Sequence, residues 1–285
     1  MGNLKRILHN VSRIVNEMEN TAKGVAFMNE CYFWASLQIG LDLSNRTLLY
    51  LYNHFGSGRA VFNAAPEEFQ KLPLQPHVVE RILGLRDSID PEKTAEEIIS
   101  KNIKITMLGE QGYPKLLAEI SDPPVLLYIK GCLPPPEMPL IALVGARKAT
   151  PYGKIMARKL AEELAVMGWG IVSGMARGVD SAAHEGTLSA KGYTLAVLGS
   201  GIDICYPREN QRLYERISEE GCLLSEFPPG TPPCSKNFPI RNRLISGCSL
   251  GTVVVEAGEK SGSLITASYA LEQGRDVFAV PGNVT

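Results

Sequence analysis

The sequence predicts an α/β protein in which a doubly wound, mostly parallel sheet follows a small helical domain. From Leu140 onward, short apolar runs rich in β-branched residues alternate with helical stretches, which is the pattern of repeated strand–helix–strand units. Between Phe33 and Arg86, apolar residues instead recur at helical spacing and are interrupted by short turns. The length of 285 residues suffices for one large domain and one small one.

We expect the chain to contain three parts. Residues 1–27 are a weakly amphipathic N-terminal extension, a helix or a leader, to which we assign no function. Residues 28–100 are expected to form the helical domain, and residues 101–285 the sheet domain. The turn at 53–58 resembles those of helix-hairpin-helix or SAM-like modules, which bind nucleic-acid backbone through turn amides. A purely structural adaptor is the alternative for this helical domain.

The strands of the sheet domain are predicted from its apolar runs. Parallel strands joined by right-handed crossovers give an extended Rossmann-like sheet with helices on both faces. Two earlier runs, 103–108 and 125–129, are expected to add strands on an edge. Ligands of such sheets bind beyond the carboxyl ends of the strands, so the loops there form the candidate site. The main predicted strands are 140–144, 170–173, 195–198, 223–225, 253–255 and 277–280.

Composition narrows the function classes. The net charge is −1, so any nucleic-acid binding must come from local basic patches. The six cysteines form no C-x-x-C pair and have no His at metal-ligand spacing, so we expect free thiols and no zinc. The sequence has no apolar run of about 18 residues that would span a bilayer and no signal peptide. We therefore expect a cytoplasmic protein.

The loop after the first main strand combines basic side chains with a helix start. Thr150 is a predicted N-cap, and Pro151 suits the first helical position. Arg147 and Lys148 then lie beside a helix N-terminus, where side-chain charge and backbone N–H groups attract phosphate. Gly145 would let the backbone approach a ligand closely. A solvated turn is the alternative.

The loop after the second main strand supplies Ser173 and two glycines, Gly174 and Gly178. Both glycines can also be ordinary turn residues. Asp180 and His184 lie one helical turn apart, so we expect them to hydrogen-bond each other and brace the loop rather than act in catalysis.

The loop after the third main strand contains Gly199-Ser200-Gly201. The full dinucleotide fingerprint G-x-G-x-x-G is absent because Ile204 stands at its last position. A nicotinamide dehydrogenase is therefore disfavoured, and no cofactor is expected.

A basic cluster follows the fourth main strand. The proline-rich segment 227–233 predicts a rigid surface loop, which brings Lys236, Phe238 and the segment 241–243 to the same rim. An aromatic ring beside basic residues is used to stack a base and clamp its phosphates, although Phe238 can equally be a core anchor. No acidic residue occurs between Phe227 and Val255, so we expect a positive or neutral field there.

The loop after the fifth main strand predicts another helix start. Ser261 and the residues beside it, Lys260 and Gly262-Ser263, offer N–H groups, hydroxyls and a charge to an anion. Glu256 could act as a general base, but we expect it to accept hydrogen bonds from neighbouring loop amides.

Taken together, these motifs resemble the bacterial DNA-processing protein A (DprA/Smf) family. The resemblance extends from about Tyr113 to the end of the chain, and its specificity comes from six separated motifs in order. The motifs are Gly145-Ala146-Arg147, Ser173-Gly174 through Asp180, Leu198 through Tyr206-Pro207, Ser225-Glu226, Phe238-Pro239 through Arg243, and Ser261 through Ala267.

The resemblance implies a protein that binds incoming single-stranded DNA in natural transformation, protects it and loads the RecA recombinase. It implies no enzymatic activity, and a homodimer for the full-length family. By this resemblance, Arg147 matches a basic position in the DNA pocket of the family, and Phe238 matches an aromatic residue beside the bound strand. Arg208 matches a commonly basic position just after Tyr-Pro, and the segment 241–243 matches the Arg-Asn-Arg element of the family. A lysine of some relatives is replaced by Ser235, with Lys236 one residue later. Because the family continues beyond Pro281-Gly282, we expect this chain to be truncated.

Two other function classes stay open at this point. Related Rossmann-like folds host nucleotide-binding enzymes such as nucleotide phosphoribohydrolases, but their Pro-Gly-Gly-x-Gly-Thr element is missing from 255–263. A pure interaction scaffold would neither bind DNA nor turn over a nucleotide. The predicted nucleic-acid-binding residues are Gly145, Arg147, Lys148, Ser173, Gly174, Arg177, Ser200, Arg208, Lys236, Phe238, Arg241, Asn242, Arg243, Lys260, Ser261, Gly262 and Ser263.

Overall fold

A computed structural model describes residues 29–282 of the chain. The expected N-terminal extension, residues 1–27, lies outside the described residues. Within the described range, every helix is too short or too polar to cross a membrane.

In the described part of the chain, six α-helices and a short 3-10 helix precede the first strand. Four of the α-helices begin at side-chain caps, because Asn29, Ser44, Ser57 and Asp90 each accept a hydrogen bond from a backbone N–H of the first turn. The elements are α2 (Glu30–Gly40), α3 (Asn45–Phe55), α4 (Gly58–Asn63), α5 (Pro66–Phe69), α6 (Pro76–Leu85), η1 (Arg86–Ser88) and α7 (Pro91–Ser100).

The remaining elements alternate strands with helices, as the apolar runs predict. They are β1 (Lys104–Met107), α8 (Lys115–Ala118), β2 (Leu126–Gly131), β3 (Leu140–Gly145), α9 (Pro151–Val166), β4 (Gly170–Ser173), α10 (Val179–Ser189), β5 (Thr194–Val197), η2 (Arg208–Asn210), α11 (Gln211–Glu220), β6 (Cys222–Ser225), α12 (Asn237–Gly247), β7 (Gly251–Glu256), α13 (Gly262–Glu272) and β8 (Asp276–Ala279).

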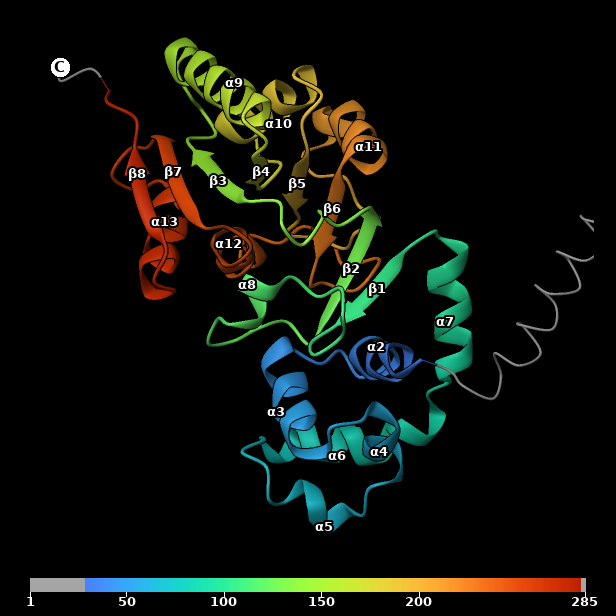
Figure 1. The fold of residues 1–285 in the computed structure, drawn as a ribbon. Coiled ribbons are helices and arrows are strands. Elements are labelled where there is room, and N and C mark those ends of the chain that lie inside the picture. Colours follow the sequence, from blue (N-terminus) through green and yellow to red (C-terminus); the bar gives the residue numbers. More distant parts are fainter. Residues whose placement is uncertain (1–28, 283–285) are drawn as a thin grey trace, which may run out of the picture.

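All eight strands found within residues 29–282 belong to one sheet in the order β1-β2-β6-β5-β4-β3-β7-β8. Strands β3 to β8 pair in parallel, whereas β2 is antiparallel to both β1 and β6. The predicted fold class and the two predicted edge strands are therefore confirmed. Figure 1 shows α9, α10 and α11 on one side of the sheet and α8, α12 and α13 on the other. The strand order reverses between β3 and β7, and such a switch point is where doubly wound sheets bind ligands.

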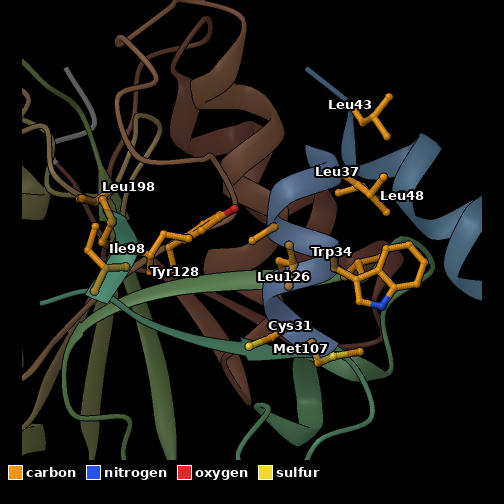
Figure 2. Close-up of a cluster of buried hydrophobic side chains, with 14 of the residues drawn as sticks. Cys31, Trp34, Leu37, Leu43, Leu48, Ile98, Met107, Leu126, Tyr128 and Leu198 are labelled. Carbon is orange, nitrogen blue, oxygen red and sulfur yellow. The ribbon is translucent and has the colours of Figure 1, made fainter. Parts of the chain in front are cut away.

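Helix α2 packs directly on the antiparallel edge of the sheet. Trp34 and Leu37 of α2 are fully buried in one cluster with Leu126 and Tyr128 of β2 (Figure 2). The hydroxyl of Tyr128 donates to Oε1 of Gln38 at 2.8 Å, and Nε2 of Gln38 donates to the backbone oxygen of Glu226 at 3.2 Å. The helical segment and the sheet thus share a hydrophobic core and buried hydrogen bonds.

The turn between α3 and α4 is held by a carboxylate from α2. Glu30 accepts a hydrogen bond from the Ser57 hydroxyl at 3.0 Å and from the Gly58 amide at 2.8 Å. An anion cannot bind the Gly58 amide while Glu30 holds it, so this turn supports a structural adaptor rather than a phosphate-binding hairpin.

Candidate nucleic-acid interface

A pocket of about 740 Å³ lies where the loops after β3 and β7 diverge, at the switch point of the sheet. Its volume is in the ordinary range of ligand pockets, about 300–1,000 Å³. Helix α12 forms another wall. Nine of the predicted binding residues line it, namely Gly145, Arg147, Phe238, Arg241, Asn242, Lys260, Ser261, Gly262 and Ser263.

The loop after β3 is fixed to the end of β7 by hydrogen bonds. Thr150 caps α9 by accepting from the Gly153 amide at 3.1 Å, and Pro151 is the first helical residue, as predicted. Glu256 accepts from the Thr150 amide at 3.0 Å and from its hydroxyl at 2.6 Å. The expectation that Glu256 binds loop amides is confirmed for Thr150.

Gly145 has a structural role that differs from the expected one. A Cβ atom at this position would lie 2.5 Å from Cγ2 of Val179 and 2.9 Å from the backbone oxygen of Glu256. The missing side chain therefore lets α10 pack against the end of β3, and the close approach is made by the protein itself.

Arg147, Phe238 and Tyr206 form an aromatic and cationic wall of the pocket. The Arg147 guanidinium carbon lies 5.1 Å from the centroid of the Phe238 ring, a cation–π distance. Phe238 is half-buried and stacks on Tyr206 with centroids 5.4 Å apart and ring planes 29° apart. One part of the Phe238 ring therefore packs on Tyr206, and another part lines the pocket.

Two glycines in neighbouring loops make room for the side chains of α12. A Cβ at Gly199 would lie 2.6 Å from Cδ1 of Phe238, and one at Gly174 would collide with the Arg241 guanidinium. The second glycine of the G-x-G element, Gly201, lies against the proline-rich loop, where its Cβ would meet the Pro228 oxygen at 2.6 Å. The glycines thus serve internal packing.

Arg241 is a buried cation at the pocket floor. Its side chain is 3% exposed and donates to the Val197 backbone oxygen. Burial lowers the pKa of Arg241 to about 10, with the nearby Asp180 opposing that shift and Arg147 adding to it, so the guanidinium stays charged at neutral pH. Burial also raises the pKa of Asp180 to about 6, against the effect of Arg241. The pocket wall holds three basic side chains, Arg147, Arg241 and Lys260, and one carboxylate.

The predicted hydrogen bond between Asp180 and His184 is wrong. Asp180 accepts from the Ala176 amide at 3.3 Å, whereas Nδ1 of His184 lies 2.7 Å from the Thr194 hydroxyl. Asp180 faces the loop and the pocket, while His184 is fully buried against β5. Burial lowers the pKa of His184 to about 3, and Arg241 adds to this shift, so the imidazole is neutral.

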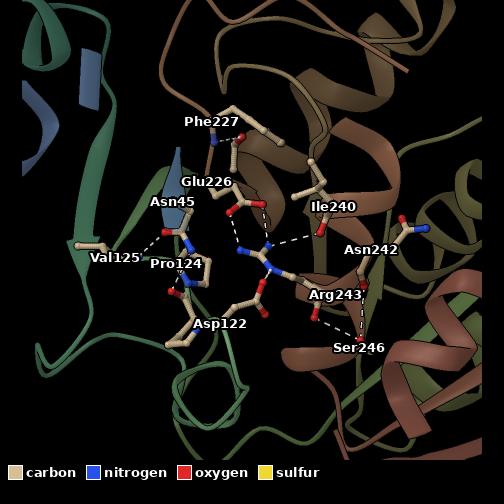
Figure 3. A network of polar contacts seen from close by, with 12 residues as sticks. Asn45, Asp122, Pro124, Val125, Glu226, Phe227, Ile240, Asn242, Arg243 and Ser246 are labelled. Atoms are coloured by element: carbon tan, nitrogen blue, oxygen red, sulfur yellow. Dashed lines mark hydrogen bonds and ion pairs between the residues drawn. The ribbon is translucent and has the colours of Figure 1, made fainter. Parts of the chain in front are cut away.

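Arg243 does not lie at the pocket rim, where we expected it. Figure 3 shows its guanidinium between Glu226 and Asp122, with Nη1 and Nη2 each 2.7 Å from a Glu226 oxygen and Nε 2.7 Å from Asp122. Its side chain is 4% exposed. Although burial opposes the charge, the two carboxylates raise the pKa of Arg243. The expectation of a purely positive or neutral field is also wrong, because Asp122, Glu226 and Asp180 approach this cluster from other segments.

The start of α13 has the predicted cap. The Ser261 hydroxyl accepts from the Ser263 amide at 3.4 Å, and Nδ2 of Asn242 donates to the Gly262 backbone oxygen at 3.1 Å. Asn242 therefore joins α12 to the helix start that faces the pocket.

The other predicted binding residues lie outside the pocket wall. The hydroxyls of Ser173 and Ser200 donate to the backbone oxygens of Leu143 and Ile204 at 2.6 Å and 3.1 Å, so both are used internally. Gly174 and Arg177 line a small neighbouring hollow, and Arg177 pairs with Glu209. Three exposed residues line none of these walls: Lys148, Arg208 and Lys236.

Among the pocket residues that the sequence prediction did not name as site residues, two contribute an aromatic ring and a charge. Tyr206 provides the stacking partner of Phe238, and Asp180 provides the carboxylate beside Arg241. The sequence does contain a signal for Tyr206, because it is an aromatic residue in a strand-end loop and stands directly before Pro207. Among residues 29–282, no three His, Cys, Asp or Glu side chains gather as metal ligands, and the six cysteines are free thiols.

The fold and pocket define a doubly wound α/β protein with a pocket lined by basic and aromatic side chains at its switch point. A family model described as DNA recombination-mediator protein A matches residues 104–285. The chain therefore belongs to this family, which confirms the resemblance seen in its motifs.

Relatives with similar sequences support this assignment. The chain is 43% identical over 210 residues to Protein Smf of Synechocystis, a match covering 72% of this chain and 53% of that protein. It is 45% identical over 190 residues to DNA processing protein DprA of Bacillus subtilis, covering 65% and 62% of the two chains. The chain thus spans about half to three-fifths of these relatives.

Two solved structures share the fold. DprA from Streptococcus pneumoniae matches with a TM-score of 0.78 and 33% identity, covering 90% of this chain and 89% of that one. DNA processing protein A from Helicobacter pylori, described with a single-stranded DNA binding mode, matches with a TM-score of 0.58 and 32% identity, covering 65% and 84%.

Proposed function

We propose that the pocket binds single-stranded DNA without strong sequence preference. The observation that carries this proposal is the gathering of Arg147, Arg241 and Lys260 with the stacked pair Phe238–Tyr206 at one switch-point pocket. The basic side chains and the N-terminus of α13 suit the negative charge of phosphates. The aromatic rings can stack on any base, and each stacked base contributes about 1–3 kcal/mol to the binding free energy. The relative from Helicobacter pylori, described as binding single-stranded DNA, supports the same ligand.

We further propose that the protein protects incoming DNA during natural transformation and helps to load RecA. This wider role is supported by membership of a family described as recombination mediators and by relatives named DNA processing proteins. A homodimer is part of the same proposal for full-length relatives.

A non-catalytic role is also part of the proposal. The one acid that was a candidate base, Glu256, accepts hydrogen bonds from the amide and hydroxyl of Thr150 and so serves the loop. Incubation with nucleoside monophosphates tests this point: we expect no released base, and release above the rate of a Glu256→Gln variant would support a phosphoribohydrolase instead.

The central test is fluorescence anisotropy of labelled oligo-dT against a duplex of the same length at several salt concentrations. We expect tighter binding to the single strand, with a log–log salt slope of about −0.7 per neutralised phosphate. Arg147→Ala should weaken binding and make the slope about 0.7 less negative, because Arg147 is exposed at the pocket wall.

Arg212→Ala is the matched control, because Arg212 is an exposed arginine of α11 that lines none of these hollows. It should bind like the unchanged protein. Equal dissociation constants for Arg147→Ala and Arg212→Ala across salt would reject the pocket as the DNA site.

A further inference from the structure

A second hollow shares Arg147 with the main pocket. This second hollow of about 510 Å³ lies between α9 and α10, and Arg147 belongs to the walls of both. We call it the α9–α10 hollow. A chain that fills the main pocket and passes over Arg147 would enter it directly.

The α9–α10 hollow is strongly basic. Its wall carries four basic side chains, Arg147, Lys154, Arg158 and Arg177, and one carboxylate, Glu185. Of the predicted binding residues, only Arg147 and Arg177 line this hollow. Its only large apolar wall residue is Ile155, so it suits a charged backbone better than an apolar ligand.

The basic groups of the hollow are available to a phosphate. Lys154 is exposed and makes no ion pair with any residue that the structure describes. Arg158 pairs with Glu185, and the two side chains are each 46% exposed. Arg177 pairs with Glu209 at 58% and 51% exposure. Exposed pairs of this kind contribute little to stability and are screened by salt, so a phosphate can replace the carboxylate as partner.

We propose that a single strand held in the main pocket continues over Arg147 into the α9–α10 hollow, where Lys154 and Arg158 contact its phosphates. This inference rests on the proposed function and adds a direction and a longer footprint to it. The occupant is the same strand because Arg147 joins the two walls. Lys154 and Arg158 lie four residues apart on α9, so they face the same side of the helix.

The test compares a short and a long oligo-dT, of about 6 and about 18 nucleotides, a range bracketing common single-strand site sizes. Lys154→Ala should raise the dissociation constant of the long strand about fivefold and make its salt slope about 0.7 less negative. Lys154→Ala/Arg158→Ala should change the slope by about 1.4. Binding of the short strand should not change, because it fills only the main pocket.

Lys159→Ala is the matched control on the same helix. Lys159 is exposed, pairs with Glu163 at 3.8 Å and lines none of these hollows. Its binding to both strands and its melting temperature should match the unchanged protein, and the melting temperature of Lys154→Ala should do the same.

The outcomes distinguish this inference from the proposed function. If Lys154→Ala and the double variant bind the long strand like Lys159→Ala, while the unchanged protein binds the short strand, the α9–α10 path is overturned and the pocket assignment stands. Equal weakening of short and long strands would also overturn the path, because the hollow would then not be a separate segment. Failure of the unchanged protein to bind either strand would reject the proposed function itself.

Discussion

Arg241 and Arg243 lie two residues apart in one short motif, yet they have different surroundings. Residues at this spacing do not share a face of a helix. Arg241 lines the pocket with Asp180, whereas Arg243 contacts Glu226 and Asp122 away from it. Arg243 therefore fixes α12 between the end of β6 and the segment before β2, and α12 in turn holds Phe238, Arg241 and Asn242 at the pocket.

Arg243→Ala should lower the free energy of unfolding by about 3–5 kcal/mol, because it leaves Glu226 buried without its partner. Urea unfolding measures this change. Arg216→Ala is the control: Arg216 makes an exposed pair with Glu220 on α11 at 3.0 Å, and such pairs contribute about 0.3–0.5 kcal/mol. Similar losses for the two variants would contradict the structural role of Arg243.

At the scale of elements, strands and helix starts follow from local sequence, and they are well predicted. The β-branched runs identify the strands, and Thr150 and Ser261 begin helices because their hydroxyls reach amides two or three residues later. The partners of Arg243 and Phe238 are not predictable in this way. Asp122 is 121 residues from Arg243 in sequence, and the contact of Gly199 with Phe238 appears only when the loop after β5 meets α12.

Gly199→Ala tests how the loop after β5 positions the aromatic wall. The added Cβ would lie 2.6 Å from Cδ1 of Phe238, so the ring must move and its stacking on Tyr206 must change. We expect several-fold weaker binding to oligo-dT, since one stacked base contributes about 1–3 kcal/mol. Gly84→Ala is the control, because nothing lies within 4 Å of a Cβ there. Unchanged binding by Gly199→Ala would show that Phe238 does not stack on DNA.

At the scale of the whole molecule, the helical segment and the sheet share one core. The buried cluster that contains Trp34 and Leu48 also contains Leu126, Leu198 and Leu223 of the sheet region. Gln38 adds buried hydrogen bonds to Tyr128 and to the backbone of Glu226, the same residue that holds Arg243. We propose that residues 29–100 and the sheet unfold as one cooperative unit, although their sequence patterns differ.

The chain offers a direct test of this cooperativity, because its two tryptophans lie in different parts, Trp34 in α2 and Trp169 just before β4. In a Trp169→Phe variant, fluorescence reports α2 alone, while far-UV circular dichroism reports all helices and strands. We expect the two urea midpoints to coincide, as two-state unfolding requires. Gln38→Ala should move both midpoints down together, because it removes buried hydrogen bonds between α2 and the sheet. A Trp34 transition at lower urea than the circular dichroism transition would instead show that the helical segment unfolds independently.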